Sequence, residues 1–133
     1  MRKYWPMRSH RFSLESVGAA LTGGGAVGAW LFGSAVDGEI RAGSDVDIAI
    51  LFGRNPGLDE LAACRARLQQ ALKFDDIDVI VLNKASVILQ FQALLGTRVF
   101  CGDAAHCAQF ASLTAREYED EMAQCRRALD AAA

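Results

Sequence analysis

Leu31-Phe32-Gly33-Ser34 opens the stretch of sequence that decides the fold, and Asp45-Val46-Asp47 with an apolar run over residues 48–52 follows after ten intervening residues. The apolar segment 26–32 predicts one strand that ends at Gly33, and residues 45–52 predict a second strand with a polar start. Turn signals lie between them, at residues 37–38 and 43–44. The chain is therefore expected to reverse direction between these two strands.

The second strand carries two carboxylates on one face. Alternate side chains of a strand point the same way, so Asp45 and Asp47 share a face while Val46 and Ile48 point into the other layer. The backbones of the two aspartates lie about 6.6 Å apart. At an effective dielectric constant of about 20, two such charges repel by roughly 2.5 kcal/mol. This arrangement therefore calls for a positive partner.

A third carboxylate is expected beside this pair. Asp78 directly precedes the apolar run 79–82, which predicts a third strand over residues 77–82. If that strand lies next to the second, Asp78 comes level with Asp45 and Asp47; whether Asp76 takes its place is left open. Oxygen-only ligands suit Mg²⁺, and two such ions can activate an attacking hydroxyl and neutralise a leaving pyrophosphate.

Gly33 and Ser34 supply the other half of a phosphate site. Glycine lets the backbone approach a phosphate closely, and the Ser34 hydroxyl with the adjacent N–H groups can donate to phosphate oxygens. No Arg or Lys lies between Phe32 and Ile40, so metal and backbone must bear most of the phosphate charge, with Arg41 the nearest cation. Each feature alone is most often a plain turn or a solvated strand end; together they favour a nucleoside triphosphate site.

The rest of the chain predicts a single small α/β domain. With 133 residues, 52% of them hydrophobic, and a net charge of −2, it reads as one globular domain without a broad basic face for nucleic acid. Residues 1–12 are expected to form a loose N-terminal arm, and residues 13–133 the domain. Ser13 can cap a helix over 14–21; further elements are helices over 58–72, 85–95 and 104–132 and a strand over 97–101. The expected fold is a small mixed sheet of about four strands flanked by helices.

Three other readings are disfavoured. Gly23, Gly25 and Gly28 match a dinucleotide-binding G-x-G-x-x-G, but that motif needs a strand before it and a helix after it. Residues 16–36 carry no charge, yet their six glycines argue against a membrane span. The cysteines form no metal-binding pattern and are expected to be reduced packing residues, as suits a cytoplasmic protein; they are Cys64, Cys101, Cys107 and Cys125.

The spacing of Gly33-Ser34, Asp45, Asp47 and Asp78 resembles that of the minimal nucleotidyltransferases of the DNA polymerase β superfamily, over about residues 14–103. The resemblance implies a Mg²⁺-dependent transfer of a nucleoside monophosphate from an NTP such as ATP to a hydroxyl. By the same resemblance Gly33 and Ser34 would hold the triphosphate, Asp45 and Asp47 the metals, and Asp78 a metal while helping to deprotonate the acceptor.

Small members of this family without a second domain resemble antitoxins of the HEPN/MNT class. The resemblance therefore implies a HEPN toxin as partner, with AMP transferred to one of its tyrosines. Relatives often carry a basic residue after Gly-Ser, whereas Ala35, Val36 and Asp37 stand here. Two alternatives stay open: an antitoxin that acts by binding alone, and a nucleotidyltransferase of small molecules such as aminoglycosides.

Overall fold

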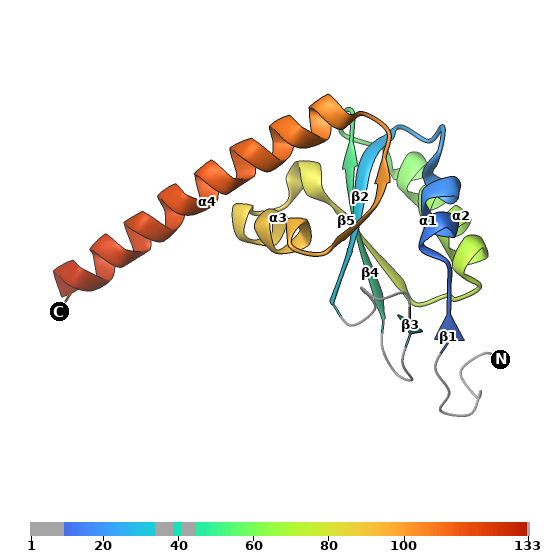
Figure 1. The fold of residues 1–133 in the computed structure, drawn as a ribbon, viewed down its shortest axis with the longest axis horizontal. Coiled ribbons are helices and arrows are strands. Elements are labelled where there is room, and N and C mark those ends of the chain that lie inside the picture. The colour runs from blue at the N-terminus through green and yellow to red at the C-terminus, as the bar shows by residue number, and fades with distance from the viewer. Residues whose placement is uncertain (1–9, 34–38, 41–44, 133) are drawn as a thin grey trace.

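The core of the fold is a four-stranded mixed sheet with helices on both faces (Figure 1), seen in a computed structural model that describes residues 10–33, 39–40 and 45–132. The sheet strands are β2 (Ala26–Phe32), β4 (Val46–Phe52), β5 (Ile77–Val81) and β6 (Thr97–Cys101). The helices are α1 (Leu14–Leu21), α2 (Leu58–Leu72), α3 (Val87–Leu94) and α4 (Ala104–Ala132), with a 3₁₀ turn, η3 (Leu82–Lys84). The predicted α/β class is confirmed.

The strand order is β5-β4-β2-β6. Strand β2 is antiparallel to both β4 and β6, so the reversal expected between the first two strands is confirmed. Strands β4 and β5 are parallel, and helix α2 provides the crossover that a parallel pair requires. At the far end of β4, the Asn83 side chain accepts from the N–H of Phe52 and donates to its carbonyl, both at 2.9 Å.

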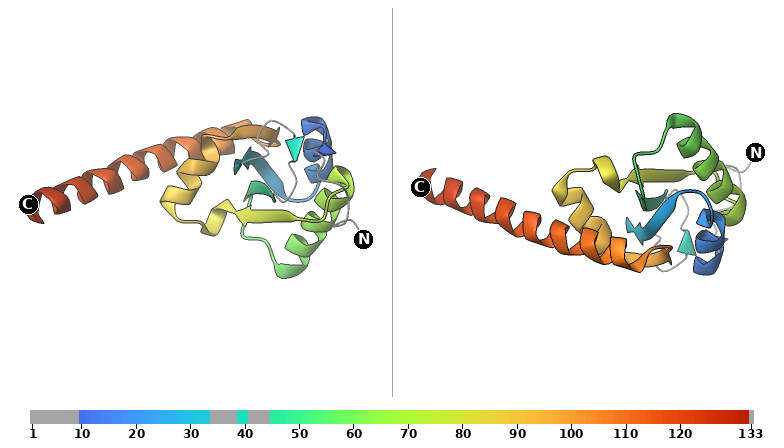
Figure 2. Two further views of the ribbon diagram at one scale, coloured as in Figure 1. Left: turned by 90° about the horizontal axis from the view of Figure 1, so that it is seen from below. Right: turned by 90° about the horizontal axis from the view of Figure 1, so that it is seen from above.

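Each face of the sheet has its own core. Helices α1 and α2 cover the face that carries Ile48 and Ile50, where Val17 and Leu68 are also fully buried. Helices α3 and α4 cover the other face, where Trp30, Ala49, Leu51 and Cys107 gather. The two pairs of helices lie on opposite sides of the strands in Figure 2. Alternate residues of β4 therefore serve two different layers, which explains why its sequence is apolar on both faces.

Helix α1 begins and ends where the sequence predicts. The Ser13 hydroxyl accepts from the N–H of Glu15 at 3.1 Å, and a glycine turn with positive φ at Gly23 and Gly25 follows the helix. A helix therefore precedes the glycine motif and strand β2 follows it, the reverse of the order that dinucleotide binding needs. The rejection of a dinucleotide site is supported by this order.

Residues 1–9 of the arm expected over residues 1–12 lie outside the described residues. His10–Arg11 forms a short strand, β1, paired antiparallel with β3 (Glu39–Ile40), and Phe12 packs against the core. Arg11 Nε lies 3.8 Å from Glu39 Oε2. Two-residue strands have no hydrophobic period of their own, so only the pairing across 28 residues reveals them.

Helix α4 continues well beyond the sheet (Figure 1). Its 29 residues correspond to about 43 Å at 1.5 Å per residue. Only its first half packs on the domain, where Cys107 and Thr114 are buried and Tyr118 stacks on Phe91 with ring centroids 3.9 Å apart. Of the described helices, none combines the length and apolar character needed to cross a membrane.

We predict that Leu68→Ala lowers the free energy of unfolding by about 2–5 kcal/mol, because it empties a fully buried position between α2 and the sheet. Leu58→Ala in the first turn of the same helix is the matched control, since Leu58 is 85% exposed. Its effect should stay within about 0.5 kcal/mol. Urea denaturation of both variants measures the difference, and equal losses would contradict the assigned packing.

Candidate active site

The parallel pairing of β4 with β5 brings the predicted carboxylates together. Asp47 lies in register with Asp78 on β5 and with Phe32 on β2, so these residues stand level on three adjacent strands. Neighbouring strands lie about 4.8 Å apart. The expectation that Asp78 comes level with the Asp45 and Asp47 pair therefore holds in the backbone register.

The carboxylates stand at the polar start of a buried strand. Val46, Ile48 and Ile50 are fully buried toward α1 and α2, which fixes Asp47 on the opposite face. Asp47 is partly buried, whereas Asp45 and Asp78 are exposed. Burial of the apolar residues of β4 thus fixes where its carboxylates lie. The carboxylates face an edge of the sheet that solvent can reach.

The environment of Asp47 disfavours its ionised form. Its pKa is raised above the ordinary value of 3.8, first by burial and then by the negative charges of Asp78 and Asp45. The two neighbouring charges identify the three aspartates as one electrostatic group. Such a group favours a bound cation, because a cation removes the repulsion that raises the pKa.

The absence of a side chain at Gly33 makes space for the Asp47 carboxylate. Its φ is +82°, and a Cβ at this position would stand 2.7 Å from Asp47 Oδ2. A side chain here would therefore be strained in its backbone and would also collide with the carboxylate. Glycine is required at the end of β2 so that Asp47 can lie directly against the backbone.

Some residues of the predicted site lie outside the described residues, and the described carboxylates do not meet at one metal position. Ser34, the segment 35–37 and Arg41 lie outside the described residues. Within residues 10–33, 39–40 and 45–132, no three His, Cys, Asp or Glu side chains converge closely enough to hold one metal ion. For the alternative Asp76, the structure gives a backbone role: its carbonyl accepts from the N–H of Val46 at 3.0 Å, which starts the β4–β5 ladder.

Residues 25–105 match the family model described as polymerase beta, nucleotidyltransferase. The chain belongs to the polymerase beta nucleotidyltransferase family. The match spans β2 to β6 and so includes Gly33, Asp45, Asp47 and Asp78. No curated protein matches the chain.

Several solved structures share the fold. A chain from a toxin–antitoxin complex with AMP-PNP is 24% identical with a TM-score of 0.72, and the match covers 90% of this chain and 97% of that one. A chain from the complex of a tri-AMPylated Shewanella oneidensis HEPN toxin with its MNT antitoxin is 22% identical, with a TM-score of 0.66 and coverage of 88% and 92%. A minimal nucleotidyltransferase is 27% identical, with a TM-score of 0.55 and coverage of 63% and 85%.

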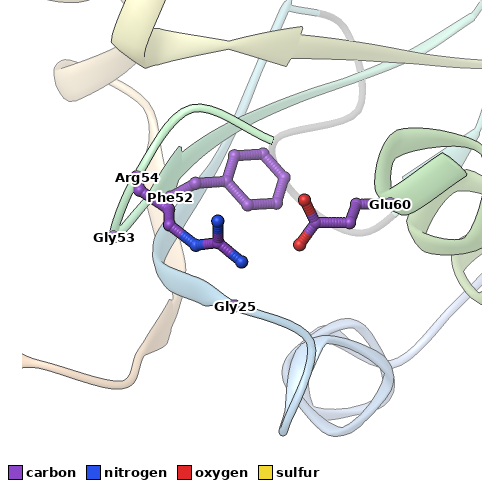
Figure 3. Close-up of a pocket in the computed structure, with 5 residues that line it drawn as sticks. All are labelled: Gly25, Phe52, Gly53, Arg54 and Glu60. Atoms are coloured by element: carbon purple, nitrogen blue, oxygen red, sulfur yellow. The ribbon is translucent and has the colours of Figure 1, made fainter. Parts of the chain in front are cut away.

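A cavity of about 270 Å³ lies at the opposite end of β4, lined by Gly25, Phe52, Gly53, Arg54 and Glu60. Arg54 and Glu60 face one another across it (Figure 3). Glu60 already caps α2 there, since its Oε1 accepts from the N–H of Gly57 at 2.9 Å. Because β4 begins beside the carboxylates and ends at this cavity, the cavity is not part of the nucleotidyltransferase site.

We predict that Asp47→Asn stabilises the metal-free protein at pH 7, by about 1 kcal/mol or less because solvent screens a partly exposed charge. A carboxyl whose pKa is raised on folding holds its proton more tightly in the folded state, so its ionised form opposes folding. That penalty is present above the raised pKa. It shrinks as the pH falls from the raised pKa toward 3.8, and it is gone below 3.8, where Asp47 is protonated both folded and unfolded.

The stability of Asp47→Asn and of the parent is compared by thermal unfolding in EDTA from about pH 3 to about pH 7, the range in which a carboxyl group titrates. The matched control is Asp59→Asn, which removes a carboxylate from the first turn of α2, where the helix dipole favours negative charge. It should not stabilise the protein. A lower melting temperature for Asp47→Asn than for the parent at pH 7 would contradict the electrostatic account.

Proposed function

We propose that this chain is a Mg²⁺-dependent nucleotidyltransferase that transfers AMP from ATP to a hydroxyl group, a tyrosine of a HEPN toxin, and thereby acts as an antitoxin. The observation that carries the proposal is the register of Asp47 with Asp78 beside Gly33 at one end of the sheet. Family membership supports the reaction class. The acceptor, the metal and the nucleotide are parts of the proposal.

Asp45, Asp47 and Asp78 would hold the magnesium ions. Their oxygen-only donor set suits Mg²⁺, and the negative charges of Asp78 and Asp45 add to the burial that raises the pKa of Asp47. When bound, Mg²⁺ supplies charge neutralisation for the triphosphate and the leaving pyrophosphate. Asp78 is exposed on the outer strand β5, and it would also take the proton from the acceptor hydroxyl.

The other half of the site would hold the phosphates. Gly33 has no side chain and the Asp47 carboxylate lies against its backbone, so a phosphate held at this turn would lie beside the carboxylates. Ser34 would donate to the phosphate oxygens. The chain itself then contributes position and hydrogen bonds, which are the main requirements of phosphoryl and nucleotidyl transfer.

A macromolecular acceptor suits the exposed site. Asp45 and Asp78 are exposed, and the cavities lined by Gly25 and Arg54 and by Ser16 and Gln70 lie away from them. An acceptor is therefore not enclosed by the described part of the chain and would bring its own surface. The relatives crystallised as toxin–antitoxin complexes support a HEPN toxin as that acceptor.

We predict that the chain, mixed with Mg²⁺, ATP and the HEPN toxin proposed as its partner, transfers label to the toxin from α-phosphate-labelled ATP but not from γ-labelled ATP. Transfer of AMP keeps the α-phosphorus and releases the β- and γ-phosphates as pyrophosphate. Asp45→Asn combined with Asp47→Asn should lower the rate at least about 100-fold, because charge stabilisation at the phosphates is lost.

The matched control in this assay is Asp59→Asn, a carboxylate on α2 that is remote from the site. It should label the toxin as the parent does. Peptide mapping of the labelled toxin should place the AMP on a tyrosine. Equal labelling by the parent and the double variant would exclude these carboxylates from catalysis, and the absence of any transfer would exclude the activity.

A second candidate is an antitoxin that acts by docking alone. One observation favours it: in the described part of the chain the carboxylates do not converge on one point that could hold a metal. Toxin neutralisation in cells separates the two functions. If AMP transfer is the function, Asp45→Asn combined with Asp47→Asn should lose protection while still binding the toxin in pull-down, whereas full protection by this variant would establish docking as sufficient.

A further inference from the structure

Two cysteines from different elements meet above one glycine of the sheet. Cys101, the last residue of β6, lies in register with Gly28 of β2. Cys107, in the first turns of α4, places its Sγ 2.5 Å from the point where a Cβ of Gly28 would stand. The absence of a side chain at Gly28 therefore leaves room for the Cys107 sulfur. Cys101 lies directly opposite Gly28 on the neighbouring strand.

The two sulfurs lie on the same side of the sheet. Residues directly opposite in an antiparallel pair project to the same face, so Cys101 points toward the face that α4 covers. The Cys107 thiol donates to the carbonyl of Val27 at 3.1 Å. Cys101 is close enough to Cys107 to raise the pKa of its thiol. Both cysteines are free thiols in the structure.

The backbone between them is already folded into a fixed turn. The Val27 carbonyl accepts from the N–H of Gly102 at 2.9 Å and from that of Asp103 at 3.3 Å. Asp103 Oδ1 in turn accepts from the N–H of His106 at 3.0 Å, at the start of α4. The approach of the two thiols is thus built into the β6–α4 connection and does not depend on chance collision of mobile side chains.

We propose that Cys101 and Cys107 are a site of reversible oxidative modification, at which hydrogen peroxide converts the two thiols into an intramolecular disulfide. Cys101 is exposed and Cys107 is buried, so peroxide reaches Cys101 first. The disulfide would join the end of β6 to the first turns of α4. This inference is independent of the proposed nucleotidyl transfer.

The reaction balances in two steps. The Cys101 thiolate attacks one peroxide oxygen, the O–O bond breaks, and after protonation one water leaves, so that Cys101 becomes a sulfenic acid. The Cys107 sulfur then attacks the Cys101 sulfur, loses its proton, and displaces the hydroxyl as a second water. Two thiols are oxidised to one disulfide, and one peroxide is reduced to two waters.

The surroundings of Cys107 suit the second step rather than the first. Burial, followed by the neighbouring Cys101, raises the pKa of the Cys107 thiol to about 11, while the charge of Arg98 opposes this rise. Cys107 is thus protonated at neutral pH and a poor nucleophile toward peroxide. Held against Cys101, it is placed to resolve the sulfenic acid as soon as that forms.

Asp-N digestion tests the pairing directly, because cleavage before each aspartate puts the four cysteines on four fragments. Cys64 falls in fragment 59–74, Cys101 in 78–102, Cys107 in 103–119 and Cys125 in 120–129. After peroxide treatment, and before any alkylation, the native chain should be lighter by about 2 Da, the mass of two hydrogens. After the remaining free thiols are alkylated, fragments 78–102 and 103–119 should be joined. Dithiothreitol should reverse both changes.

Single variants identify which thiol acts. Cys101→Ser, at an exposed position, should slow the loss of the Cys107 thiol at least about tenfold. Cys107→Ser should leave Cys101 as a sulfenic acid that dimedone traps, and Cys125→Ser, the matched exposed control, should form the disulfide at the parental rate. A disulfide mainly between Cys101 and Cys125, a bond between two chains, or no oxidation of Cys101 while Cys125 is oxidised would each overturn the proposal.

Discussion

The parallel register of β4 with β5 is the constraint on which the rest of the structure depends. It places Asp47 beside Asp78, an arrangement that electrostatics opposes: two charges about 5–7 Å apart repel by roughly 2–3 kcal/mol at an effective dielectric constant of about 20. The apolar half of the same strand outweighs this cost. Ile48 and Ile50 are fully buried, and each such side chain contributes about 1.5–3 kcal/mol. The core therefore fixes the carboxylates in a position that they would not adopt alone.

Most of this arrangement is predictable because each strand carries its own signal. The apolar runs 26–32 and 97–101 and the helical spacing over 58–72 coincide with β2, β6 and α2 to the residue. The level of Asp78 with Asp47 depended on one further assumption, that the third predicted strand lies next to the second, and the parallel pairing of β4 with β5 meets it. Local patterns thus predicted the elements, whereas the position of Asp78 depended on how the strands pair.

What escaped prediction depends on contacts between distant segments. The β1–β3 pair joins His10 to Ile40, and strands of two residues leave no pattern in either segment. Cys101 and Cys107 are six residues apart on different elements, and only the bulged pairing of β2 with β6 places both against Gly28. The cysteines were expected to be packing residues, which holds for the burial of Cys64 and Cys107 but not for the exposed Cys101 and Cys125.

Strand β2 carries both of these arrangements, through two glycines that are required for different reasons. Gly33 at its end has a positive φ and admits the Asp47 carboxylate, whereas Gly28 near its start admits the Cys107 sulfur. Between them, Trp30 packs under α4, with its ring centroid 6.4 Å from that of Phe110. An added methyl group would collide at either glycine, yet only the carboxylate end carries a net charge to be neutralised. Under the two proposals, the two ends of one strand serve different chemistry, cation and phosphate binding at one and thiol oxidation at the other.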